Sequence, residues 1–148
     1  MKIGFIICIL ILGVKGCDPV TVLPTDGSEE KNIDFPCGKV TILVTKSLGP
    51  GYIISHEFNL NKEITLFFDS LQIIYHNKLL LYEILDAQTG NLITDKNLTL
   101  NEKRIINLDI DENLQPGDSL FVQMQGFMIC EGMSVYDDKL TIILEDHP

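Results

Sequence analysis

Alternation of apolar and polar residues at a period of two is the feature that most constrains the fold of this chain. It is cleanest in Tyr52–Leu60, where the even positions are apolar or aromatic except for His56, and the residues between them include Ser55, Glu57 and Asn59. Successive side chains of a strand point to opposite faces of its sheet. A helix would instead place apolar residues three or four positions apart. The segment therefore predicts a strand with one buried face.

Short runs of β-branched, aromatic and other apolar residues recur from Phe35 onward, separated by turn residues. The other expected strands are Val40–Lys46, Glu63–Asp69, Leu71–Tyr75, Leu79–Leu85, Asn91–Thr94, Lys103–Ile110, Ser119–Gln125 and Leu140–Leu144. Helical patterns are scarce, and no helical crossover separates these runs. We therefore expect an all-β fold, an antiparallel β-sandwich of about eight strands that is Ig-like or transthyretin-like. The strand order cannot be read from the pattern.

The first seventeen residues have the character of an export leader. Met1 and Lys2 give a positive start, and Ile3–Leu12 is an apolar run too short to cross a bilayer as a permanent helix. We therefore predict a signal peptide over residues 1–16.

Val14, Gly16 and Cys17 resemble the lipobox of bacterial lipoproteins, whose cysteine becomes the lipidated N-terminus. Lys15 departs from the pattern, which usually has a small or apolar residue there. The resemblance covers residues 1–17 alone and implies a membrane anchor on Cys17. The alternative is an ordinary secretory leader cut near Gly16, and the sequon that begins at Asn97 would then be a glycan acceptor in a eukaryotic secretory pathway.

Cysteine parity favours the anchor. Cys8 leaves with the leader, so Cys17, Cys37 and Cys130 remain. An odd number of cysteines in an oxidising compartment leaves one thiol reactive or paired between chains. If lipid occupies Cys17, a Cys37–Cys130 disulfide is the one pairing left, and we expect it in preference to two buried free thiols.

Composition divides the remaining chain and restricts its partners. Residues 17–34, rich in proline, glycine and charge, are expected to be the lipidated cysteine and a flexible spacer, and residues 35–148 the sandwich domain. The formal net charge is −10, and loss of Lys2 and Lys15 with the leader makes it −12. Such a body repels phosphate-rich surfaces, so nucleic acid is not an expected partner.

Catalytic motifs are missing from the sequence. It contains no G-x-S-x-G, no H-E-x-x-H, no phosphate-binding glycine loop and no C-x-x-C. His56 is expected to be a hydrogen-bonded core residue, while His76 lies in a turn and His147 next to the chain end. We therefore expect neither an enzyme nor a cofactor. A small hydrolase that uses dispersed Asp, His56 and Tyr residues is the weakest alternative.

Acidic residues crowd the region after the strand Lys103–Ile110. Asp109, Asp111 and Asp118 are weak candidates for Ca²⁺ ligands, together with Glu112 and Asn113. The run opens like an EF-hand loop, but Leu114 replaces its glycine and Leu120 its final glutamate. A solvated acidic loop is the preferred interpretation, so no metal site is expected. Asp137 and Asp138 form a weaker cluster of the same kind.

Aromatic and apolar surface residues are the remaining candidates for binding. Tyr52, Tyr75, Tyr82 and Tyr136 could line a ligand patch, although Tyr52 and Tyr82 are expected to be half-buried. The stretch Gly126–Ile129 is either a partner-binding edge or the end of a core strand.

The leader, Cys17 and the lack of catalytic groups lead to one functional expectation. The chain is expected to be a lipid-anchored protein of the cell envelope, on a periplasmic or surface face, acting as a non-enzymatic binding or scaffolding module for a protein or glycan partner. The alternative is a freely secreted β-sandwich that binds an extracellular ligand.

Overall fold

Short antiparallel strands make up the structure, a computed structural model that describes residues 30–135 and 139–144. The strands are β1 (Glu30–Phe35), β2 (Gly38–Lys46), β3 (Tyr52–Leu60), β4 (Ile64–Phe67), β5 (Gln72–Tyr75), β6 (Lys78–Leu79), β7 (Glu83–Asp86), β8 (Asn97–Leu100), β9 (Arg104–Ile110), β10 (Ser119–Gln123), β11 (Met128–Cys130), β12 (Met133–Ser134) and β13 (Lys139–Ile143). A 3₁₀ turn at Phe68–Ser70 is the one helical element of the described residues. The all-β expectation is therefore confirmed.

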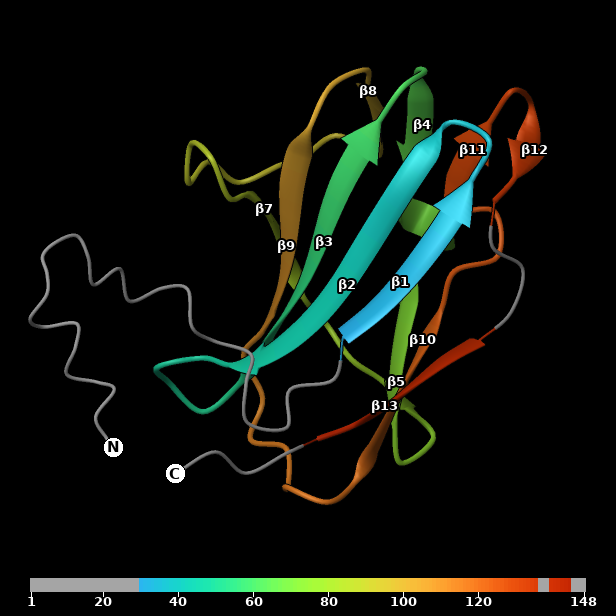
Figure 1. The fold of residues 1–148 in the computed structure, drawn as a ribbon. Helices are drawn as coiled ribbons and strands as arrows, with labels where there is room; N and C mark the ends of the chain where they lie inside the picture. Colours follow the sequence, from blue (N-terminus) through green and yellow to red (C-terminus); the bar gives the residue numbers. More distant parts are fainter. Residues whose placement is uncertain (1–29, 136–138, 145–148) are drawn as a thin grey trace, which may run out of the picture.

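The strands form three antiparallel sheets in a sandwich-like arrangement (Figure 1). One sheet has five strands in the order β1-β2-β3-β9-β7, and the other two have the orders β13-β10-β5-β6 and β12-β11-β4-β8. The two four-stranded sheets are halves of one interrupted layer, because β4 leads to β5, β10 to β11 and β12 to β13. The interruptions include the 3₁₀ turn at Phe68–Ser70 and the turn around Gly126, whose φ is +76°.

The period-two pattern explains how the layers hold together. In β3, Tyr52, Ile54, His56 and Phe58 are buried, while the residues between them face outward. Strands β2 and β9 alternate in the same way. The buried apolar side chains of all three sheets form one contiguous cluster. At about 25 cal/mol per Å² of apolar surface, burial of this cluster is the main stabilising contribution.

The chain changes layer between β6 and β7. Leu80–Tyr82 runs from the edge of a four-stranded sheet to the edge of the five-stranded sheet, outside any strand. Leu80 is buried, and its amide donates to the Ile73 carbonyl at 2.8 Å. The Tyr82 hydroxyl donates to the Leu71 carbonyl at 2.8 Å. Because alternate side chains of this extended segment point inward, Leu81 between them points outward.

Several strand boundaries differ from the prediction. The expected strand Leu79–Leu85 divides into β6 and β7 at the change of layer, and Asn91–Thr94 contributes only the bridge Leu85–Leu92. The short strands β8 and β12 lie outside the predicted strands, and β11 falls in the Gly126–Ile129 stretch, for which a core strand was one of two interpretations. About eight strands is therefore an underestimate. Strand β1 begins at Glu30, inside the expected spacer, because residues 30–35 pair along their whole length with β2.

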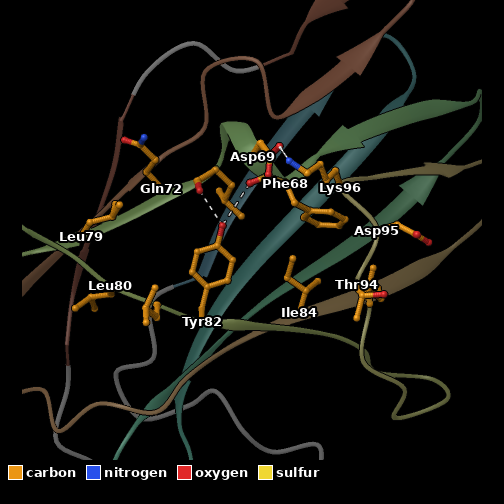
Figure 2. Close-up of a pocket in the computed structure, with 13 residues that line it drawn as sticks. Phe68, Asp69, Gln72, Leu79, Leu80, Tyr82, Ile84, Thr94, Asp95 and Lys96 are labelled. Atoms are coloured by element: carbon orange, nitrogen blue, oxygen red, sulfur yellow. Dashed lines mark hydrogen bonds and ion pairs between the residues drawn. The ribbon is translucent and has the colours of Figure 1, made fainter.

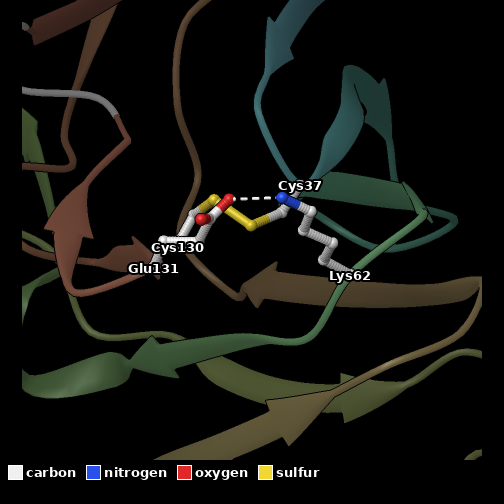
Figure 3. The surroundings of a disulfide bond; sticks show 4 residues. All are labelled: Cys37, Lys62, Cys130 and Glu131. Atoms are coloured by element: carbon white, nitrogen blue, oxygen red, sulfur yellow. Dashed lines mark hydrogen bonds and ion pairs between the residues drawn. A yellow bond between two sulfur atoms is a disulfide. The ribbon is translucent and has the colours of Figure 1, made fainter.

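The expected disulfide is present and joins the two layers (Figure 3). Cys37 lies in the turn between β1 and β2, Cys130 ends β11, and their Cα atoms are 6.0 Å apart. Both side chains are buried, and the two cysteines are 93 positions apart in the sequence. Beside the bridge, Lys62 Nζ pairs with Glu131 Oε2 at 2.7 Å. On the chain-entropy argument, closing so long a loop stabilises the fold by about 4 kcal/mol.

Replacing Cys37 and Cys130 together by alanine should lower the free energy of unfolding by about 2–4 kcal/mol, because the unfolded chain regains the entropy of an open loop. Denaturant unfolding measures the change. A reductant should shift the wild-type midpoint downward and leave the double variant unaffected. Equal midpoints for oxidised and reduced wild type, or two alkylatable thiols in the native protein, would contradict the account.

Candidate functional site

A groove of about 950 Å³ lies on the outside of the five-stranded sheet, at the end where β2 turns into β3. Its floor is a row of residues directly opposite one another on three neighbouring strands, Ile53 on β3, Asp109 on β9 and Glu83 on β7. Its walls are the loop 47–50 on one side and the Leu81–Tyr82 segment on the other. Asp111 and Glu112 complete the lining. The lining residues come from three separate parts of the chain, 47–53, 81–83 and 109–112, and the sheet register brings these parts together.

Gly51 holds the loop wall in place. The Ser47 amide donates to the Gly51 carbonyl at 3.0 Å and closes the loop. A Cβ built on Gly51 would overlap the carbonyl oxygen of Ile110, so only glycine allows the loop to lie this close to the end of β9. The loop carries Leu48, which is fully exposed.

Two leucines therefore face water across one groove. Leu81 is 85% exposed because Leu80 and Tyr82 on either side of it point inward. Leu48 is exposed because its loop projects from the sheet. Isolated exposed leucines are common on protein surfaces, but two that line the same concave surface with Ile53 and Pro50 form an apolar patch. Patches of this kind mark interaction sites.

Acidic groups surround the apolar patch. Glu83 and Asp109 share one face of the sheet as cross-strand partners, an arrangement that destabilises a sheet when the charges have the same sign. Within residues 30–135 and 139–144, no lysine or arginine forms an ion pair with Glu83, Asp109 or Asp111. Glu112 alone among the lining acids has a cation, Lys78 Nζ at 2.8 Å. The groove is therefore strongly negative.

A smaller depression of about 380 Å³ adjoins the groove on the other side of Leu81 (Figure 2). Tyr82 stands at its centre with its hydroxyl directed to the backbone of the 3₁₀ turn region, and burial, with a smaller effect of Asp69, raises the pKa of Tyr82 to about 12. Lys96 Nζ pairs with Asp69 Oδ2 at 3.0 Å across it. The depression has less than half the volume of the groove, and its Tyr82 hydroxyl and its Lys96–Asp69 pair are already engaged, so the larger groove is the better candidate for binding.

The weak metal candidates are not brought together. Asp109 and Asp111 line the groove, but Asp118 lies beside the β5–β6 hairpin, where it accepts the Tyr75 hydroxyl at 2.6 Å and lies 3.2 Å from His76 Nε2. The Asp118 carboxylate raises the pKa of Tyr75. The ring of His76 stacks on Tyr75 with centroids 4.2 Å apart. This cluster fastens the hairpin to the loop before β10, a contact that the sequence pattern did not reveal.

Among the described residues, three side chains of kinds that can bind a metal do lie close together. They are Cys37, Cys130 and Glu131. The two sulfurs are bonded to each other and the carboxylate is paired with Lys62, so the group has no thiolate to offer a metal (Figure 3).

His56 is a core residue, as expected, but its expected hydrogen bonds are missing. It is 1% exposed, its ring packs against Phe58 and Phe127, and neither ring nitrogen has a hydrogen-bond partner among the described residues. Burial lowers the pKa of His56 to about 4. The nearby backbone of Ile54 raises the pKa by less than burial lowers it, and it does not form a hydrogen bond with either ring nitrogen. The imidazole is therefore neutral and is surrounded by aromatic rings, away from the groove.

The remaining candidates have structural positions. Tyr52 is fully buried, deeper than expected. Phe127 and Met128 are buried and β11 pairs on both sides, so the Gly126–Ile129 stretch ends in a core strand and is no partner-binding edge. Asn97 is exposed at the start of β8. Cys17, Tyr136, Asp137, Asp138 and His147 lie outside the described residues.

Sequence reasoning did not identify Leu48, Leu81 and Glu83 as site residues. Two features pointed toward them. Leu48 is a lone leucine in the glycine- and proline-rich turn after β2, and Leu79, Leu81 and Leu85 share the outward face of an alternating segment. Their convergence depends on the register of β3, β9 and β7, which is a long-range property.

Within the described residues, no helix is long and apolar enough to span a membrane. Comparisons of the chain with protein-family models, with curated proteins and with solved structures give no match.

Burial of neutral His56 makes stability depend on pH. In the unfolded chain the imidazole takes up a proton below its usual pKa of about 6.5, whereas in the folded protein it stays neutral down to about pH 4. Acidification from pH 6.5 to 4 therefore favours the unfolded state by about 3 kcal/mol through this residue. Above pH 6.5 the effect vanishes, because both states are neutral.

His56→Phe should remove this part of the pH dependence. The measurement is the free energy of unfolding of both proteins at pH 7.5 and pH 4.5, and the difference between them isolates His56 from the carboxylates that both share. If wild type and variant lost the same stability on acidification, the buried neutral imidazole would be disproved.

Proposed function

We propose that this protein is a non-enzymatic binding module, anchored to a cell-envelope membrane through lipid on Cys17, and that the groove between Leu48 and Leu81 is its partner-binding surface. The observation that carries the binding role is the pair of outward-facing leucines on one concave, acidic surface. A fold that exposes them in water gains nothing from them in stability, whereas a partner that covers them gains apolar burial.

The chemistry of the lining supports binding more than catalysis. Its polar side chains are carboxylates, the Ser47 hydroxyl and the Tyr82 hydroxyl, which is engaged with the Leu71 carbonyl. The three acids without a cation partner lie beside apolar side chains, and the nearest described histidines lie elsewhere, His56 in the core and His76 on Asp118. Acid–base chemistry needs a group poised to take and return a proton at the substrate. The groove instead supplies fixed charge and apolar area.

We propose that the sandwich belongs with the Ig-like or transthyretin-like architectures, and its buried disulfide between layers is the feature it shares with antibody domains. The groove lies on the outer face of the five-stranded sheet, at the end opposite the Cys37–Cys130 bridge, because Ile53 and Leu60 are at opposite ends of β3 and Leu60 pairs beside Cys37 at Gly38.

Secretion without an anchor is the alternative function. The exposed position of Asn97 on β8 is compatible with a glycan there if the protein passes through a eukaryotic secretory pathway. An intact-mass measurement separates the two proposals, since acylation and glycosylation add different masses.

Cys17→Ala should release the protein from the membrane fraction to the soluble fraction, because the variant lacks the acyl chains, each buried CH₂ of which contributes about 0.8 kcal/mol to membrane binding. Cell fractionation with immunodetection measures the distribution. Cys8→Ala, which alters a cysteine of the expected leader, is the matched control and should leave the protein in the membrane fraction. Retention of Cys17→Ala in the membrane fraction would disprove the anchor.

A further inference from the structure

We propose that the partner seated in this groove is a basic, apolar polypeptide segment, in which leucine-like side chains alternate with or stand beside lysine or arginine. The inference rests on the proposed binding function and specifies the chemistry of its partner. Two independent properties of the groove, its apolar walls and its uncompensated negative charge, lead to it.

The apolar walls require an apolar group on the partner. Leu48 on the loop and Leu81 on the opposite wall flank Ile53 and Pro50, and both leucines expose nearly all of their side-chain surface. Covering each leucine removes its apolar surface from water, which favours binding. A partner without apolar side chains would leave this contribution unused, so a purely polar cation is a poor match.

The charge requires a cation on the same partner. Glu83 and Asp109 lie directly opposite on neighbouring strands, roughly 5 Å apart across the ladder. Asp111 adds a third charge, and none of the three has a cationic partner within the described part of the chain. A lysine or arginine placed between Glu83 and Asp109 relieves their mutual repulsion and gains attraction from both.

A second copy of this chain is a poor occupant. Its formal net charge is −10, and docking it onto an acidic groove would bring like charges together. Nucleic acid and anionic lipid are disfavoured for the same reason. For a basic segment of another protein that also carries apolar side chains, apolar burial and charge attraction both favour binding.

Fluorescence anisotropy with labelled synthetic peptides tests the inference on the mature protein purified in non-ionic detergent. The probe is a peptide of alternating leucine and lysine, with one control that replaces every lysine by glutamate and a second that replaces every leucine by serine. The leucine–lysine peptide should bind, and raising the salt concentration should weaken its binding because part of the attraction is ionic. Each control peptide lacks one of the two matched properties and should bind at least about tenfold more weakly.

Groove variants locate the site. Leu81→Ser should weaken binding of the leucine–lysine peptide by about tenfold, and Glu83→Gln with Asp109→Asn by about threefold to tenfold at low salt. Matched controls are Met133→Ser, which removes an exposed apolar side chain of β12, and Glu63→Gln, which removes an exposed acid beyond the other end of β3. Both controls should bind like the wild type.

Three results would overturn the inference. Equal affinity for the three peptides would show that the groove does not select this chemistry. Binding that the groove variants leave unchanged would place the site elsewhere on the acidic surface. A dimer of this protein that Leu81→Ser abolishes would replace the partner by a second copy. The peptide experiments test the chemistry of the partner, and the Cys17→Ala fractionation tests the membrane anchor. Either proposal can therefore fail without the other.

Discussion

Packing of the inner faces of two β-layers against each other, joined at one end by the Cys37–Cys130 bridge, is the constraint on which the rest of the structure depends. One layer is interrupted, and the chain must pass between layers to complete both. At the passage between β6 and β7, Leu80 and the Tyr82 ring turn inward to join the core or its margin, and Leu81 consequently faces water. The wall of the groove is therefore a direct consequence of how the core is closed.

Stability alone does not account for the composition of the groove. Glu83 opposite Asp109 is unfavourable for the sheet, and exposed leucines at positions 48 and 81 add no apolar burial to the isolated domain. Elsewhere on the same sheet, Glu57 has a lysine partner, Lys103. Local departures from favourable packing and charge pairing are expected where a surface serves a partner. The groove combines both departures in one place.

The sequence pattern was sufficient for the strands whose alternation is long and regular. Tyr52–Leu60 was predicted to the residue, and its alternation of buried and outward-facing side chains was correct. The pattern failed for β8, a four-residue strand that pairs with the distant β4, and for β12, a two-residue strand that pairs with its neighbour β11. Cysteine parity predicted the disulfide because few pairings remained. The groove could not be predicted, since the register of β3, β9 and β7 sets which side chains meet, and no local feature encodes it.

In the proposed binding mode, the Leu80–Tyr82 segment and the loop between β2 and β3 form one binding surface. Mapping amide chemical shifts of the ¹⁵N-labelled protein during titration with the leucine–lysine peptide tests it most directly. The largest shift changes are expected at Leu48, Leu81, Glu83 and Asp109, while the amides of Met133 and Asn97 should be unchanged. Changes centred on any other surface, with these four amides unmoved at saturation, would contradict this binding mode.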